Sequence, residues 1–298
     1  MKVITAFREG WKMVVLHRRM WLILYLVNLV FAVVATIAFR GWLKDTAGYS
    51  LALAHNIGRF DFTFITDLIR NYGGLSLLCE QVIVIAIAYL IFSAFLVGGI
   101  LHIYLHQREK FSARDFLSGG ALYFWRMLRL AGYFLLIQFG LLAIFCLVFI
   151  AIGVNPKEME SDVQFLQYVK IILPVYLFMA LVIVIMHDYV KIYVVQQNAH
   201  PMTKAFGSGI RFVMRHFGSV LLLYMLNLLL LIIFIVAYSQ IRNMIPTVTP
   251  GGILVGFILS QLFLIGRIGV KLLILSSVNQ LVQQKNEDIV GNSTVQVS

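Results

Sequence analysis

Charged residues are scarce in this chain. They make up 12% of its 298 residues, whereas hydrophobic residues make up 61%. A water-soluble domain typically carries about 25% charged residues. Such a chain could not cover its surface with polar groups in water, so we expect lipid to be the solvent for much of it. The composition thus excludes an ordinary soluble fold.

Metal-site spacings and catalytic motifs are missing as well. Cys79 and Cys146 show neither the spacing of a metal site nor a disulfide framework. The chain has no H-E-x-x-H, G-x-S-x-G or G-x-x-x-x-G-K-[ST] motif. Asp188 is the only carboxylate inside the core of a predicted membrane helix, whereas a metal-dependent lipid phosphotransferase needs several. We therefore predict no enzyme activity, no metal and no cofactor.

Long apolar runs are what the chain does contain. A bilayer core of ~30 Å needs about 20 apolar residues in a helix. The first run is too long for a signal peptide and no A-x-A site follows it, so we interpret it as a retained helix. We predict an all-α, polytopic membrane protein, with one transmembrane domain over residues 1–285 and a disordered tail over 286–298. Six runs qualify as membrane helices: 20–39, 81–105, 130–153, 170–195, 217–240 and 252–278.

The basic residues predict the orientation. The N-terminus and the second and fourth loops, with their flanks, carry 14 Lys and Arg, whereas the third and fifth loops carry only Lys157, Lys170 and Arg242. The first loop carries four basic and four acidic residues, but long loops cross the membrane regardless of charge. Both termini are therefore expected in the cytoplasm, and this asymmetry explains most of the net charge of +11 without a nucleic-acid partner.

The sequence also contains an internal repeat. Residues 6–29 match 205–228 without a gap, pairing Gly10 with Gly209, His17 with His216, Tyr25 with Tyr224 and Asn28 with Asn227. A weaker third copy begins at Phe116. The predicted unit is a cytoplasmic amphipathic helix followed by a transmembrane hairpin, used three times in parallel.

Two connecting segments resemble helices that lie at a membrane surface. Ser112–Asp115 has the form of a capping box, and residues 202–215 mix basic with large apolar side chains. A plain cytosolic connector is the alternative.

Polar groups on the even-numbered helices predict a candidate ligand site. Asp188 lies 18 residues beyond Lys170, or ~27 Å from the outer boundary, and Arg267 and Lys271 reach a similar depth. His102 falls near this level too. We expect these groups to line a net-positive pocket for an anionic headgroup or phosphate in the cytoplasmic half of the membrane: Asp188, Lys191, Arg267, Lys271 and His102.

A structural role for the same residues is the alternative. Lys191 and Lys271 could extend to the headgroups, and Asp188 could pair with Arg267 to lock two helices. For the uncharged polar residues within the membrane we expect hydrogen bonds between helices: Asn28, Asn227, Gln138 and Gln261.

Several short motifs carry a family resemblance. They are Asp188–Lys191 at the end of the fourth predicted helix, Ala205–Phe206, Gly209–Phe212 and Tyr224. In these and in the order of its six helices, the chain resembles a loose group of bacterial integral membrane proteins. The group is similar in outline to the membrane domain fused to some glycerophosphodiester phosphodiesterases. The resemblance implies a bacterial cytoplasmic membrane, but phosphodiesterase activity does not carry over because that domain is missing.

These observations support one expected function and one alternative. We expect a protein that binds, senses or transports a lipid or other anionic amphiphile from the cytoplasmic side. The alternative is a non-catalytic structural or assembly factor that binds other membrane proteins.

Overall fold

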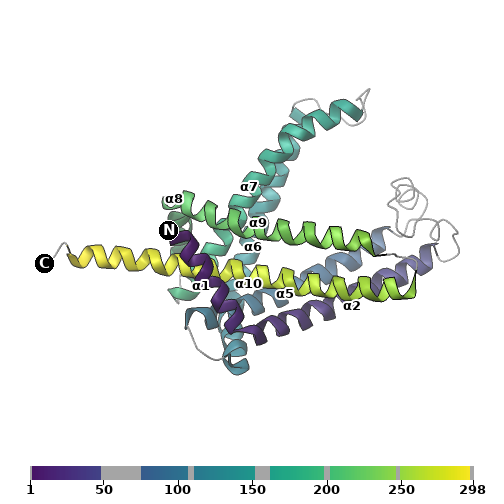
Figure 1. Cartoon of the computed structure of the whole chain (residues 1–298). Helices are drawn as coiled ribbons and strands as arrows, with labels where there is room; N and C mark the ends of the chain where they lie inside the picture. The colour runs from purple at the N-terminus through teal and green to yellow at the C-terminus, as the bar shows by residue number, and fades with distance from the viewer. Residues whose placement is uncertain are drawn as a thin grey trace. The chain divides into compact units, whose positions relative to one another are not determined.

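The computed structural model describes residues 2–47, 75–106, 111–151, 162–197, 202–245 and 249–295. These residues form helices only, which confirms the predicted all-α class. In Figure 1 the helices follow the chain in this order: α1 (Lys2–Leu16), α2 (Arg18–Ala47), α5 (Leu75–Leu105), α6 (Ala113–Ala151), α7 (Asp162–Gln196), α8 (Met202–Arg215), α9 (Phe217–Met244) and α10 (Pro250–Val295).

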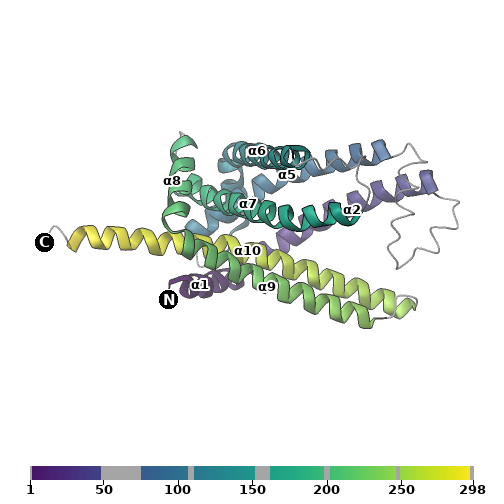
Figure 2. The ribbon, with the colours of Figure 1, turned by 90° about the horizontal axis from the view of Figure 1, so that it is seen from above.

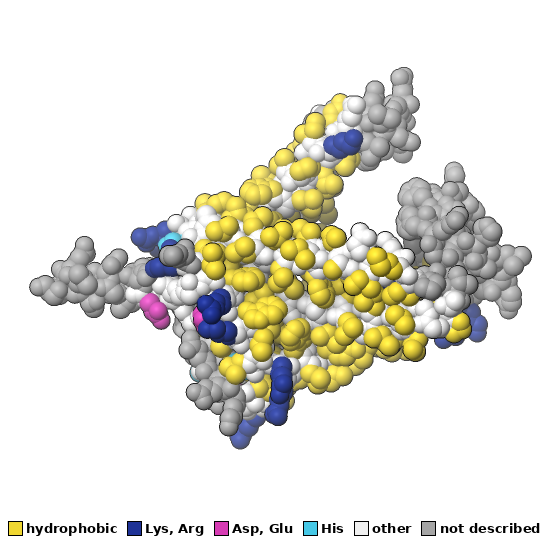
Figure 3. All heavy atoms as spheres, viewed as in Figure 1, with side chains coloured by type: hydrophobic (Ala, Val, Ile, Leu, Met, Phe, Trp, Pro, Cys, Tyr) yellow, Lys and Arg dark blue, Asp and Glu magenta, His cyan; other side chains and the backbone are white. Residues whose placement is uncertain are grey.

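Six of these helices are long and apolar enough to cross a membrane: α2, α5, α6, α7, α9 and α10. Many of their large apolar side chains are exposed, and hydrophobic side chains are spread over the helical surface visible in Figure 3. A helix suits this setting because it satisfies its own backbone hydrogen bonds where no water is present. The protein is therefore a multi-pass integral membrane protein.

Two helices extend further than the sequence predicted. α6 runs without a break from the capping segment through the membrane span, and the amide of Asp115 donates to Ser112 Oγ at 3.4 Å, as the capping box predicted. α10 stays helical to Val295, so the predicted disordered tail from residue 286 is helical up to that point. Val278, Leu281 and Val282 are buried and continue one apolar face of α10 beyond the predicted membrane run as far as residue 282.

The chain divides into two compact units. The first contains Met1–Leu16, Ala94–Asn227 and Leu273–Ser298, and the second contains His17–Ser93 and Leu228–Leu272. The first unit thus holds α1, α6, α7 and α8 with parts of α5, α9 and α10. The second holds α2 with the remaining parts of α5, α9 and α10. Each unit is described by itself below.

Glycines allow close helix packing in the first unit. A Cβ atom on Gly10 of α1 would lie 2.8 Å from the backbone nitrogen of Ser277 on α10. One on Gly209 of α8 would lie 2.9 Å from the Cα atom of Val190 on α7. On α6, one on Gly119 would overlap with the Cβ atom of His102 on α5. Each amphipathic segment thus packs on the last helix of a hairpin.

The first and last copies of the predicted repeat share a helix break. α1 ends at Leu16 and α2 begins at Arg18, with His17 between them. α8 ends at Arg215 and α9 begins at Phe217, with His216 between them. His17 and His216 are the residues that the repeat pairs, whereas α6 has no such break. The two outer copies therefore have the same outline, and the threefold repeat stays a prediction.

Cysteine labelling can test the predicted orientation. In a variant without native cysteines, Arg8→Cys should react with a membrane-impermeant maleimide only after the cells are permeabilised, since the basic N-terminal segment is expected inside. Glu158→Cys, in the third predicted loop, should react in intact cells. The reverse labelling pattern would contradict cytoplasmic termini.

Candidate functional site

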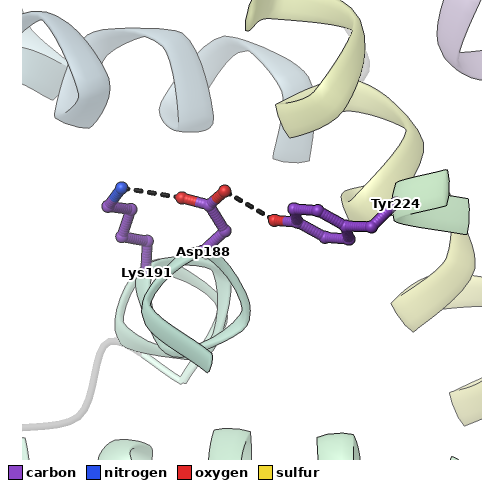
Figure 4. A network of polar contacts seen from close by, with 3 residues as sticks. All are labelled: Asp188, Lys191 and Tyr224. Carbon is purple, nitrogen blue, oxygen red and sulfur yellow. Dashed lines mark hydrogen bonds and ion pairs between the residues drawn. The ribbon is translucent and has the colours of Figure 1, made fainter. Parts of the chain in front are cut away.

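Asp188 lies at the centre of a polar cluster within the first unit. It precedes Lys191 by one turn of α7, and Lys191 Nζ donates a hydrogen bond to Asp188 Oδ1 at 2.8 Å. From α9, the Tyr224 hydroxyl donates to Asp188 Oδ2 at 2.5 Å. Figure 4 shows the carboxylate between these two side chains, each facing one of its oxygens. Both carboxylate oxygens therefore have a partner.

The cluster is almost closed to solvent. The side chain of Asp188 is 14% exposed and that of Lys191 is 16% exposed. A charge at this depth in a membrane helix needs a counter-charge or a hydrogen-bond partner. Lys191 therefore neutralises Asp188, and the pair adds no net charge to its surroundings.

The residues on either side of Asp188 point toward other helices. The His187 ring stacks on Phe134 of α6, with centroids 4.5 Å apart. The Tyr189 ring stacks on Phe212 of α8, with centroids 5.4 Å apart. Successive residues in a helix differ by about 100° in direction. Three consecutive residues of α7 therefore contact three different helices, and α7 links α6, α8 and α9.

A pocket opens beside these aromatic contacts. It lies between α6 and α8 and has a volume of about 500 Å³. Phe206 in its wall packs on Phe134, with ring centroids 5.6 Å apart, and Phe134 in turn stacks on His187. The pocket is thus linked to the polar cluster by a row of three rings. Its lining is apolar apart from two hydroxyl groups: Leu130, Tyr133, Leu136, Ile137, Thr203, Phe206 and Gly207.

Basic residues flank both walls of this pocket. Arg129 directly precedes Leu130 on α6, and Lys204 directly follows Thr203 on α8. Both side chains are exposed. An apolar cavity with cations beside it matches a molecule that has an apolar chain and an acidic head.

The predicted ligand site includes one pair in direct contact within the first unit. Asp188 and Lys191 are in contact, as their spacing predicted. Arg267 and Lys271 are exposed on the part of α10 that belongs to the second unit. Their pairing with Asp188 stays a prediction, as does ligand binding by the predicted set. His102 is half-buried where α5 meets α6, with its ring 4.2 Å from that of His106.

Tyr224 is the member of the cluster that sequence reasoning did not place in the site. In the sequence, Tyr224 stands out as a repeated residue that matches Tyr25 and as one of the residues that carry the family resemblance. In the second unit the Tyr25 hydroxyl donates to Gln261 Oε1 at 2.9 Å. Both repeated tyrosines therefore hydrogen-bond to a polar side chain on another membrane helix. The sequence signal that could have identified Tyr224 as part of the cluster is a tyrosine repeated at matching positions of two apolar helices.

Hydrogen bonds between helices are confirmed for three of the four uncharged polar residues. The Tyr89 hydroxyl on α5 donates to Asn28 Oδ1 on α2 at 3.1 Å. Asn227 Nδ2 donates to Ser277 Oγ on α10 at 3.4 Å. Gln261 accepts from Tyr25. Gln138 is half-buried on α6, and its role stays a prediction.

Among the described residues, no group of three or more His, Cys, Asp or Glu side chains could hold a metal ion. Cys79 and Cys146 are exposed and free. No family model, curated protein or solved structure matches the chain.

Proposed function

We propose that this integral membrane protein binds an anionic amphiphile from the cytoplasmic side, with its apolar chain in the pocket between α6 and α8. The observation that carries the proposal is the pocket itself, at about 500 Å³. This volume falls within the range of ligand sites, roughly 300–1,000 Å³. A lipid chain or a fatty acid has the size and polarity to occupy it.

The surroundings of the pocket support an acidic head. Arg129 directly precedes the lining residue Leu130 and Lys204 directly follows the lining residue Thr203, and a basic residue near an anionic membrane surface contributes about 1 kcal/mol to binding. Thr203 adds a hydroxyl group at the N-terminal end of α8. The head therefore lies toward the start of α8, and the chain extends along α6 toward Ile137.

The ring contacts suggest how binding is sensed. A chain in the pocket touches Phe206, which packs on Phe134, and Phe134 stacks on His187 beside Asp188. Moving Phe206 thus moves a ring that touches α7 next to the polar cluster. Sensing in this form needs no catalytic group.

A glycine in the pocket wall offers a direct test. Nothing lies within 4 Å of a Cβ atom built on Gly207, so Gly207→Leu should fill the pocket without distorting α8. We expect it to weaken binding of a fatty acid by about tenfold, equivalent to ~1.4 kcal/mol. Binding is measured by native mass spectrometry of the detergent-solubilised protein, with oleate as the probe.

Gly132→Leu is the matched control. Gly132 lies on α6, is not part of the pocket lining and also has open space around it. Its substitution should change oleate binding by less than about twofold. Equal binding by both variants and the unchanged protein would contradict the proposal and favour the assembly-factor alternative.

A further inference from the structure

The corner between α8 and α9 carries two adjoining basic residues, Arg215 and His216. α8 ends at Arg215, His216 forms the corner and α9 begins at Phe217. The amide of His216 donates to the Phe212 carbonyl and the amide of Val220 donates to the His216 carbonyl, both at 3.0 Å. The turn is therefore closed on both sides by helical hydrogen bonds, which hold Arg215 and His216 in a defined position.

A third basic residue comes from α10. α9 and α10 lie side by side in Figures 1 and 2, and Asn227 of α9 donates to Ser277 of α10. His216 lies eleven residues, or ~16 Å, before Asn227. Lys285 lies eight residues, or ~12 Å, after Ser277. Since the two helices run in opposite directions, Lys285 reaches the level of the corner to within about one turn.

The electrostatics of His216 agree with this placement. Burial lowers the pKa of His216, and the positive charges of Lys285 and Arg215 lower it further. A cation that disfavours the charged form of a histidine must be near it. Lys285 therefore faces the same corner as Arg215.

Among the described residues, no carboxylate forms an ion pair with Arg215, His216 or Lys285. Glu287 is exposed and follows Lys285 by two residues, a spacing that places it on another side of the helix. Gathering cations without a counter-charge is unfavourable, and a bound anion would relieve the repulsion.

We propose that Arg215, His216 and Lys285 bind the phosphate group of an anionic lipid in the adjacent leaflet. The lipid is favoured over a soluble anion because the corner directly precedes the membrane span of α9. Met214, beside Arg215, is 63% exposed and offers an apolar surface to a lipid chain. This site uses none of the residues of the α6–α8 pocket and does not depend on the function proposed for it.

Removing two of the charges tests the site. In the full-length protein in detergent, Arg215→Gln with Lys285→Gln should weaken binding of phosphatidylglycerol by about 25-fold, since each basic residue near a membrane surface contributes about fivefold. Binding of phosphatidylcholine should be unchanged. Native mass spectrometry gives both affinities, with inorganic phosphate added as a competitor in a separate series.

The control removes the same charge elsewhere. Arg8 of α1 and Arg114 of α6 are exposed, so Arg8→Gln with Arg114→Gln should change phosphatidylglycerol binding by less than about twofold. Equal losses in the two double variants would overturn the proposal, because binding would then follow net charge alone. Displacement of the lipid by millimolar inorganic phosphate would also overturn it, since the ligand would then be soluble phosphate. Gly207→Leu should leave the preference for phosphatidylglycerol unchanged, which separates this site from the pocket.

Discussion

Replacing Lys191 with methionine should lower the free energy of unfolding by about 3 kcal/mol. The substitution keeps the length of the side chain but leaves Asp188 without its counter-charge, with only the Tyr224 hydroxyl as a partner. Removing one member of a buried ion pair typically costs about 3–5 kcal/mol. The Asp188 side chain is 14% exposed, so its ion pair with Lys191 is close to a buried ion pair. Denaturation in mixed micelles, followed by circular dichroism, measures the change.

A double variant separates pairing from a general effect. Asp188→Asn with Lys191→Met removes both charges and should recover part of the loss, because neither charge is then left unpaired. Arg267→Met, at an exposed position of α10, should change stability by less than about 0.5 kcal/mol. Losses from the two single variants that simply add would show that Asp188 and Lys191 are not partners.

Gly209→Ala should destabilise the protein by about 2 kcal/mol. The added methyl group would lie 2.9 Å from the Cα atom and 2.8 Å from a side-chain carbon of Val190, so α8 and α7 must move apart. Overpacking of this kind typically costs about 1–3 kcal/mol. Thermal unfolding of the solubilised protein should show the loss as a lower midpoint.

Gly207→Ala is the control on the same helix. Its methyl group meets open space, so the better helix propensity of alanine should leave stability unchanged or raise it by up to about 1 kcal/mol. Gly10→Ala should behave like Gly209→Ala, since Gly10 packs equally closely on Ser277. If all three substitutions had the same effect, close packing of the amphipathic helices would not be what holds them in place.

The six membrane helices were predictable because lipid imposes one simple requirement. A span needs a run of apolar residues of a given length, and such a run can be recognised in the sequence without knowledge of the tertiary structure. The amphipathic segment 202–215 was predictable for a similar reason and matches α8 residue for residue. The end of α10 was not, because the burial of Val278, Leu281 and Val282 depends on tertiary packing.

The candidate site was predictable only in part. Counting residues along a helix predicts the depth of Asp188 and shows that Lys191 shares its helix face. In the structure these two side chains form an ion pair. Depth does not say which neighbouring helix a side chain meets. The sequence did not indicate that the second carboxylate oxygen of Asp188 accepts a hydrogen bond from Tyr224 on α9.

The sequence by itself determined that this chain crosses a membrane with six helices, and that one embedded carboxylate has a lysine on its own face. Only the tertiary structure decided that Tyr224 completes the cluster and that a pocket opens between α6 and α8. The physical reason is that apolar length and helical spacing are local properties of the chain. The partners of a side chain across a helix contact depend on the rotation and crossing of whole helices, which packing alone sets.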